Sequence, residues 1–283
     1  MKLCRFDDNR LGLIDGDQVI DATAALDGLP RHRWAFPPGD PVITNLAKLQ
    51  PIILELGKTR TRHALAGVAL GAPIANPGKI IGAPVNYHAH KSEADADEAL
   101  HQGRRVMPID EIGLFLKATS ALAGPAEGIQ LRFPDRRSDF EGEVVAVIGR
   151  TVDQCSVGEA MDAVAGYTLG LDMSVRGKED RSFRKSCDSY AVMGPCFVTA
   201  DEISDPTAIR METRVNGELR QQGDTSQLIR SIAELVVMAS AFYTLHPGDL
   251  IMTGTPAGVG PVAVGDLIEV ASPAMGTLRV AVN

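Results

Sequence analysis

Short apolar stretches separated by turn residues dominate the chain from about residue 79 onward and predict a region rich in β-strands. The predicted strands cover residues 79–81, 114–117, 129–133, 141–148, 165–172, 194–199, 209–215, 250–254 and 267–270. One amphipathic helix is predicted among them, because apolar residues recur at helical spacing from Ile229 to Tyr243 after the polar start Asp224-Thr225-Ser226.

The first 74 residues show a different pattern. Residues 2–20 alternate around Asp15-Gly16-Asp17, which predicts a small hairpin, and the periodic stretches 42–56 and 59–70 predict helices. Glycine and proline then cluster at residues 71–78 and predict a boundary. We therefore expect a small N-terminal domain over residues 1–74 and a larger domain over residues 75–283.

Composition and charge narrow the class of protein. The chain has 283 residues, 45% apolar and 23% charged, which is typical of a globular protein. Its net charge of -8 argues against nucleic acid and anionic membranes as partners, and the apolar stretch at 235–245 is shorter than the ~20 residues of a membrane helix. Four cysteines without CxxC spacing and an N-terminus without an apolar signal core predict a cytoplasmic protein with reduced thiols.

The segment Glu141-Gly142-Glu143 is the most informative in the chain, because it places two carboxylates on one face of a strand that reads as buried. The next apolar strand ends in Asp172, which a neighbouring position in a sheet would bring beside them. Three clustered carboxylates without cysteine or histidine suit Mg²⁺ or Mn²⁺, with Ca²⁺ as a third option. The competing interpretation is a solvated strand end.

A second group follows Asn86-Tyr87. If a helix begins there, His90 and Glu93 are neighbours on one face, and the carboxylate can orient the imidazole as a general base for activating water. A surface helix start with incidental histidines competes with this interpretation, and His88 is read as incidental.

Further candidates lie beyond Asp172. Arg176 and Lys185 are cations that could hold a substrate carboxylate and stabilise enolate or alkoxide charge. The competing interpretation is that the charged stretch between them is only a solvent-exposed loop. Thr255 lies in a glycine-rich turn that lacks the ending of a phosphate loop and suits a small anionic ligand, with a plain hairpin as the alternative.

These motifs, taken in order, resemble the fumarylacetoacetate hydrolase family. The resemblance covers about Lys79 to Asn283, and the N-terminal piece resembles the small leading domain of many bacterial members. It rests on residues 86–93, 115–117, 141–143, 166–172, 185–195, 215–218 and 253–260. The resemblance implies an α+β fold, predominantly a mixed β-sheet roll or barrel, with a divalent metal, a homodimer in many members, and small anionic 2-oxo acids as substrates.

The resemblance also implies roles for individual residues. The metal ligands would be Glu141, Glu143 and Asp172. The catalytic residues would be His90, Glu93 and Lys185, and the substrate-binding residues would be Arg176, Gln222 and Thr255. The sequence departs from the family pattern at Gly177, where many members have aspartate, at Glu179, where they have glutamine, and in a shortened stretch from Arg176 to Lys185. Ala83 replaces an additional metal-binding aspartate of the tyrosine-catabolic branch.

The expected activity is hydrolysis of a carbon–carbon bond in an acylpyruvate from aromatic catabolism, such as fumarylpyruvate, maleylpyruvate or fumarylacetoacetate. The metal would act as a Lewis acid while His90, held by Glu93, deprotonates water and Lys185 offsets negative charge. Residues 93–107 are expected to form a lid. Two alternatives stay open: a decarboxylase or isomerase of a small 2-oxo diacid (oxaloacetate or oxo-heptenedioate), and a catalytically silent, metal-stapled binding module.

Overall fold

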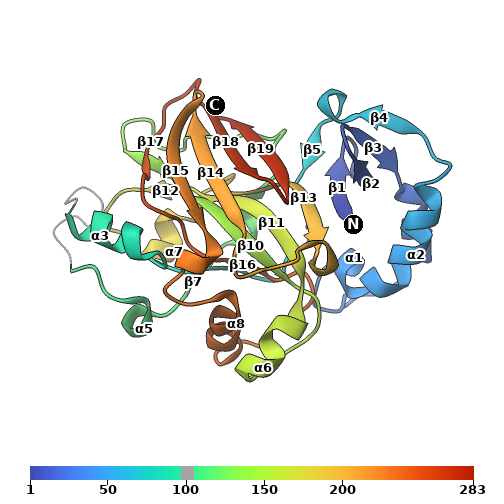
Figure 1. The fold of residues 1–283 in the computed structure, drawn as a ribbon, viewed down its shortest axis with the longest axis horizontal. Helices are drawn as coiled ribbons and strands as arrows, with labels where there is room; N and C mark the ends of the chain where they lie inside the picture. The colour runs from blue at the N-terminus through green and yellow to red at the C-terminus, as the bar shows by residue number, and fades with distance from the viewer. Residues whose placement is uncertain (97–104) are drawn as a thin grey trace.

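A large mixed β-sheet runs through the centre of the protein (Figure 1). The computed structural model describes residues 1–96 and 105–283. The path of the sheet runs in the order β4 (Arg62–Ala64), β3 (Gln18–Asp21), β2 (Arg10–Asp15), β1 (Lys2–Phe6), β13 (Ala191–Thr199), β11 (Val164–Asp172), β10 (Gly142–Ile148), β16 (Leu250–Met252), β6 (Ile80–Gly82) and β7 (Phe115–Lys117), with β5 (Leu70–Gly71) on β1 and β8 (Leu122–Ala123) on β13. Its strand pairs are antiparallel except β16–β6 and β13–β8, so the sheet is mixed.

Two smaller sheets complete the β-structure. An antiparallel sheet runs in the order β15 (Glu218–Asp224), β14 (Arg210–Val215), β18 (Leu267–Ser272) and β19 (Gly276–Ala281) and packs across β10, β11 and β13. A three-stranded sheet joins β12 (Ser174–Val175), β9 (Ser138–Phe140) and β17 (Gly260–Pro261). This arrangement confirms the predicted α+β class with a predominantly β, mixed-sheet body.

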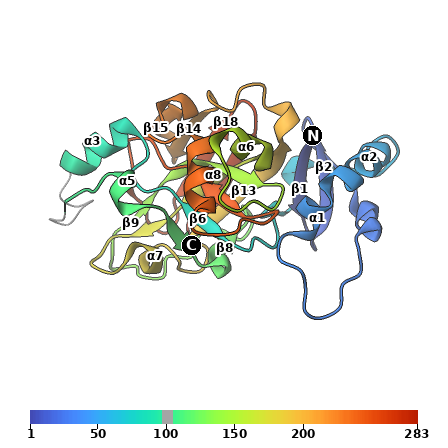
Figure 2. The same cartoon turned by 90° about the horizontal axis from the view of Figure 1, so that it is seen from below.

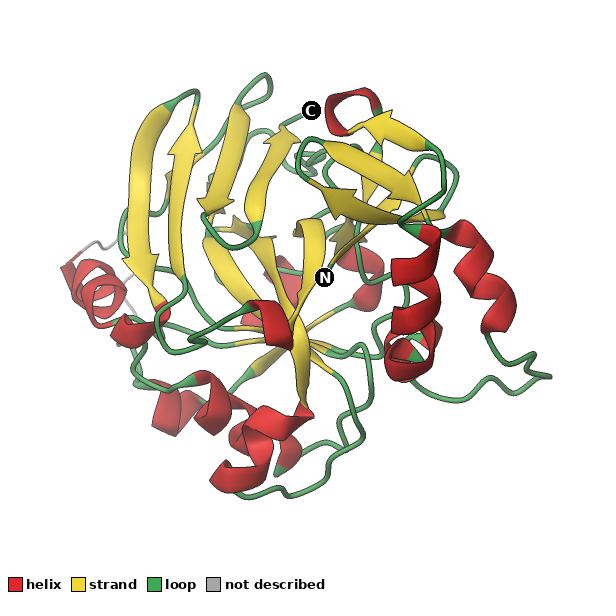
Figure 3. Cartoon of the chain, turned by 45° about the vertical axis from the view of Figure 1, so that its right-hand side comes forward, coloured by secondary structure: helices red, strands yellow, loops and turns green. Residues whose placement is uncertain are grey.

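The helices lie outside the sheets (Figures 2 and 3). They are α1 (Pro41–Thr44), α2 (Leu46–Leu56), α3 (His88–Ala96), α5 (Ile109–Ile112), α6 (Val157–Ala160), α7 (Arg181–Arg184) and α8 (Ile232–Ser240), with 3₁₀ turns at Thr23–Gly28, Leu65–Gly67, Thr119–Ala121, Met161–Ala163, Ala200–Glu202 and Thr225–Gln227. Within the described residues, no helix has both the length and the apolar character needed to cross a membrane. The expected lid over 93–107 falls largely on residues 97–104, which lie outside the described part of the chain.

The apolar residues of β10 explain why this strand is buried on both faces. Val144, Ala146 and Ile148 pack into one hydrophobic cluster, whereas Val145 and Val147 pack into a second cluster on the opposite face. Side chains alternate along a strand, so a continuous apolar run fills both sides of a covered sheet. The strand therefore begins at the acidic motif and runs directly into the core.

The N-terminal hairpin forms as predicted. Asp15 pairs with Gln18 across the turn, and Gly16 has a positive φ of 62°, which glycine adopts at no steric cost. The predicted helix at 42–56 appears as α1 and α2. Leu3 pairs with Phe197 of β13, so the N-terminal strands extend the large sheet by hydrogen bonding. The domain boundary between residues 74 and 75 remains a prediction.

Two predicted elements were wrong. Residues 59–70 form β4, a 3₁₀ turn and β5 in place of a helix, because Arg62 and His63 pair with the exposed edge of β3. Residues 129–133 form only an isolated bridge, between Ile129 and Val282. The segment that lies beside them ends at Asn283, so it offers no further residues for pairing. In both places long-range pairing, which local spacing does not encode, decides the structure.

The predicted helix at 229–243 exists but begins later than its polar start suggested. Asp224 caps the 3₁₀ turn Thr225–Gln227, whereas α8 begins at Ile232 with Ser231 as its cap. Ser231 Oγ accepts a hydrogen bond from the Glu234 amide, and the Glu234 carboxylate accepts one from the Ser231 amide. This reciprocal capping box fixes the start of the helix.

Candidate active site

Glu141 and Glu143 flank Gly142 at the start of β10, and Asp172 is the last residue of the adjacent strand β11. Gly142 lies opposite Leu171, and the Asp172 amide donates to the Glu141 carbonyl at 2.8 Å. This antiparallel register brings Asp172 beside the glutamates. One carboxylate oxygen from each residue lies within 4.8 Å of the others, so the structure brings the three predicted acids together.

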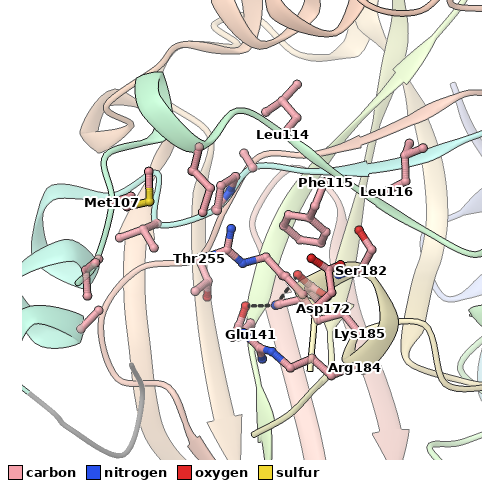
Figure 4. Close-up of a pocket in the computed structure, with 18 of the residues that line it drawn as sticks. Met107, Leu114, Phe115, Leu116, Glu141, Asp172, Ser182, Arg184, Lys185 and Thr255 are labelled. Atoms are coloured by element: carbon pink, nitrogen blue, oxygen red, sulfur yellow. Dashed lines mark hydrogen bonds and ion pairs between the residues drawn. The ribbon is translucent and has the colours of Figure 1, made fainter. Parts of the chain in front are cut away.

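Two buried lysines neutralise part of this acidic cluster. Lys185 Nζ lies 2.7 Å from both Glu141 Oε2 and Asp172 Oδ2 (Figure 4). Lys117 Nζ lies 2.5 Å from Asp172 Oδ1. Burial alone would raise the pKa of Glu141, but Lys185 and Arg176 outweigh it and hold that pKa below its ordinary value. Burial lowers the pKa of Lys117, and the charge of Asp172 opposes this shift.

Glu143 is the acid of the cluster with the least compensation. Its Oε2 accepts a hydrogen bond from the Gly254 amide at 2.7 Å, and the carboxylate forms no ion pair with any described residue. Burial, followed by the charges of Asp172 and Glu141, raises its pKa well above the ordinary value. A buried carboxylate in this situation is stabilised by a cation, so the residues fit a divalent metal that prefers oxygen ligands.

The glycine between the glutamates is required by close packing. A Cβ atom on Gly142 would lie 2.2 Å from Thr213 Oγ1 of the second sheet. The Gly142 amide donates to Gln221 Oε1 at 3.0 Å, and its carbonyl accepts from Thr255 Oγ1 at 2.8 Å. The small residue therefore lets the two sheets approach at the point where the acids emerge.

Gly142→Ala is expected to destabilise the protein by about 1–3 kcal/mol, because the added methyl group forces the sheets apart. Metal-dependent activity should fall in parallel as the neighbouring carboxylates shift. Gly67→Ala is the matched control, since a Cβ atom there meets nothing within 4 Å. Thermal unfolding and activity assays of both variants check this, and equal stability of the two would contradict the packing argument.

His90 and Glu93 face each other on α3, as the helical spacing predicted. His90 Nδ1 lies 2.9 Å from Glu93 Oε2, and Glu93 Oε1 accepts a hydrogen bond from the Gly258 amide at 2.9 Å. His90 is buried and lines the same cavity as the three acids. Glu93 therefore orients the ring, and Nε2 is left for a proton taken from a bound molecule.

The predicted substrate-binding arginine is tied to the acidic cluster. Arg176 Nε donates to Asp139 Oδ2 at 2.7 Å, and its Nη2 donates to Glu141 Oε1 at 3.1 Å. Asp139 is fully buried and also accepts from Arg137 Nε at 2.7 Å. Arg176 therefore holds Glu141 in place and lines the cavity at the same time.

Thr255 is buried against the acidic motif and lines the cavity, whereas Gln222 does not reach it. Gln221 takes the inner position: its Nε2 donates to Thr255 Oγ1 at 2.7 Å. Gln222 lies instead on a second cavity, together with Arg210 and Ser272. Because successive residues of β15 point to opposite faces, the two glutamines cannot share a site, and this corrects the expectation for Gln222.

The cavity has a volume of about 700 Å³, in the usual range for a small-molecule site. The three acids and His90 form one part of its wall, and the cationic side chains of α7 and Lys185 form another. Leu114, Phe115 and Met107 add an apolar part (Figure 4). The cavity therefore combines hard oxygen ligands, an oriented imidazole and positive charge.

Sequence reasoning missed several cations of this site, among them Lys117 and the two arginines of α7. Lys117 ends the apolar strand β7 and is fully buried on Asp172, and Arg181 and Arg184 line the cavity from α7. A lysine within an apolar strand was a usable signal, because an ammonium group is rarely buried without a partner. The two arginines gave no such signal within a charged run.

The acidic cluster and the oriented histidine on one cavity define the site of a metal-dependent enzyme. Residues 79–283 match the family model for the C-terminal domain of fumarylacetoacetate (FAA) hydrolase. The chain therefore belongs to the fumarylacetoacetate hydrolase family, as its motifs predicted.

Relatives of known function and structure extend this result. The chain is 50% identical over 285 residues to a maleylpyruvate hydrolase of Aquipseudomonas alcaligenes, covering 100% of this chain and 99% of the relative. It is 35% identical to a mitochondrial oxaloacetate tautomerase of Xenopus laevis, covering 88% of this chain and 76% of the relative. A crystal structure of maleylpyruvate hydrolase from Sphingobium sp. SYK-6 with manganese(II) ion and pyruvate shares 38% identity, with a TM-score of 0.84 over 100% of this chain and 98% of that chain.

Proposed function

We propose that this protein is a divalent-metal-dependent hydrolase that cleaves a carbon–carbon bond in an acylpyruvate, with maleylpyruvate as the first candidate. Fumarylpyruvate and fumarylacetoacetate are the related candidates. The observation that carries the proposal is the position of the three acids and the His90–Glu93 pair on one cavity. The 50% identity to a maleylpyruvate hydrolase over the full chain supports the substrate class.

Glu141, Glu143 and Asp172 would hold the metal, for which Mn²⁺ and Mg²⁺ are the first choices. Glu143 has no cationic partner among the described side chains, and burial together with the neighbouring acids raises its pKa, so a cation there relieves an unfavourable arrangement. When bound, the ion supplies Lewis-acid polarisation of the substrate's 2-oxo acid group. A manganese(II) ion is present in a solved maleylpyruvate hydrolase structure, which supports this choice.

His90 is proposed to take a proton from water, with Glu93 holding the ring through Nδ1. Water oxygen then bonds to the acyl carbonyl carbon, and the bond from that carbon to the pyruvyl methylene carbon breaks. The electron pair passes to the methylene carbon, which takes up a proton to give pyruvate. The acyl part leaves as a carboxylic acid, so one acylpyruvate and one water give two acids.

Lys185 is proposed to stabilise negative charge that develops during cleavage, since its ammonium group lies within 2.7 Å of two of the acids. Arg176 and Thr255 are proposed to position the substrate from the cavity wall. Lys117 is proposed to hold Asp172 in place, because the two side chains are buried together.

A panel of substrates tests the function. The purified protein with Mn²⁺ or Mg²⁺ should convert maleylpyruvate to pyruvate and maleate in equal amounts, a chelator should abolish turnover, and added metal should restore it. Unchanged acylpyruvate throughout the panel, with metal bound, would contradict the proposal. Consumption of oxaloacetate with loss of CO₂ would support a decarboxylase instead, and its tautomerisation alone would support the activity for which the Xenopus laevis relative is named.

The cellular compartment and the oligomeric state of the protein are also proposals. We propose that the enzyme works in the cytoplasm, which agrees with four free cysteines. A homodimer is proposed from the family resemblance, and light scattering during size-exclusion chromatography would measure the mass against the 30.1 kDa of one chain.

A further inference from the structure

Arg181, the first residue of α7, lines the active-site cavity. Among residues 1–96 and 105–283, its guanidinium group forms no hydrogen bond or ion pair. Its Cζ atom lies 5.7 Å from the centre of the Phe115 ring, so the group rests over an aromatic face. The five N–H donors of this half-buried group are therefore available.

The other described cations that line the cavity each form an ion pair or a hydrogen bond, including Arg105, whose guanidinium group lies 3.6 Å from Glu111. Arg176 donates to Asp139 and Glu141, and Lys185 donates to Glu141 and Asp172. Arg184 Nη1 donates to the Val175 carbonyl at 3.2 Å. Among the described cations of the cavity, Arg181 and Arg184 therefore lack an ion-pair partner, and Arg181 is the one whose guanidinium group also forms no hydrogen bond.

The nearest acid along the chain does not neutralise Arg181. Asp180 caps α7, and its Oδ1 accepts a hydrogen bond from the Ser182 amide at 2.8 Å. Burial lowers the pKa of Arg181, while the more distant charges of Glu141, Asp172 and Asp180 raise it. A half-buried guanidinium without a direct partner forms a stronger ion pair with a carboxylate than an exposed guanidinium does, because little water is present to screen the two charges.

We propose that Arg181 binds the distal carboxylate of a dicarboxylic acylpyruvate and so determines which acyl chains the enzyme prefers. This inference rests on the proposed function, in which the 2-oxo acid end of the substrate lies at the acidic cluster. Arg181 lies on the wall of the same cavity, so one ligand can carry an anionic group to each. The planar guanidinium matches a carboxylate through two parallel hydrogen bonds, which an apolar acyl chain cannot supply.

Two inert ligands isolate this interaction: 2-oxoheptanedioate and 2-oxoheptanoate share the 2-oxo acid end and the chain length, and they differ only in the distal carboxylate. Calorimetric titration of the Mn²⁺-loaded protein gives the dissociation constant of each. The wild-type protein should bind the diacid about 10- to 100-fold more tightly, the range expected for a charge-assisted pair. Neither ligand can be cleaved, so binding is measured without turnover.

Three variants complete the test. Arg181→Gln should reduce the preference for the diacid to about twofold or less and leave the affinity for the monoacid unchanged, while Arg181→Lys should restore part of the preference. Arg105→Gln is the matched control, because Arg105 lines the same cavity but its guanidinium lies 3.6 Å from Glu111.

The outcomes separate this inference from the function on which it rests. Equal affinity of the wild-type protein for both ligands, or an equal loss of preference in Arg181→Gln and Arg105→Gln, would overturn the role of Arg181 and leave the proposed hydrolase intact. Binding of neither ligand by the metal-loaded protein would overturn both proposals.

Discussion

Replacing Glu143 with glutamine is expected to abolish metal binding and turnover while the metal-free protein stays folded and becomes more stable. Glutamine keeps the size of the side chain and can still accept the hydrogen bond from the Gly254 amide. It cannot supply a charged ligand. The loss of metal affinity should therefore exceed the roughly 10- to 100-fold effect of losing an outer partner of a metal site.

The sign of the stability change follows from the raised pKa of Glu143. An unfolded chain ionises this acid near its ordinary value of 4.5, whereas the folded protein resists its ionisation, so the carboxylate favours unfolding as the pH rises above that value. Glutamine removes this penalty at neutral pH. Differential scanning calorimetry at pH 7 should give a Tm a few degrees higher for the metal-free variant.

Glu179→Gln is the matched control for this experiment. Glu179 lines the same cavity, but both of its oxygens pair with Arg136, at 2.9 and 2.8 Å. Metal affinity should be unchanged in this variant. Retained metal binding in Glu143→Gln, or a lower Tm of its metal-free form, would contradict the proposed role of Glu143.

Replacing His90 with alanine is expected to lower kcat by about 100- to 10,000-fold, the contribution typical of a positioned general base. Metal affinity should stay the same, because His90 contacts Glu93 and forms no hydrogen bond with the three acids. Steady-state kinetics and metal titration measure the two effects separately. This separation distinguishes a catalytic role from a structural one.

His88→Ala is the control for this prediction, since His88 begins the same helix and is exposed. Its kcat should remain within about twofold of the wild-type value, as expected for a surface substitution. An unchanged kcat in His90→Ala would remove the water-activating role and favour the silent binding module. A loss of metal binding in that variant would instead place His90 among the groups that support the metal.

The acidic site could be predicted from the sequence because its signals are local. Glu141 and Glu143 stand at the start of an apolar run that continues for five residues, and this burial makes paired carboxylates informative. The spacing of His90 and Glu93 fixes their contact within one helix, as the structure shows. Asp172 joins them because strand β11 ends next to the start of β10.

The parts that sequence reasoning could not place depend on contacts between distant segments. Lys117 reaches Asp172 although strands β10, β16 and β6 separate β7 from β11 in the large sheet. The resemblance implied Gln222, but which glutamine of β15 faces the acidic motif depends on the pairing of β15 with β14. Arg62–Ala64 forms a strand for a similar reason, since the edge of β3 offers a partner.

Anomalous diffraction at the manganese absorption edge, from crystals grown with Mn²⁺, tests the central claim most directly. A single strong peak should lie at about 2.0–2.2 Å, the usual length of a metal–carboxylate bond, from an oxygen of each of Glu141, Glu143 and Asp172. A peak elsewhere, or none among these three carboxylates at saturating Mn²⁺, would contradict the account.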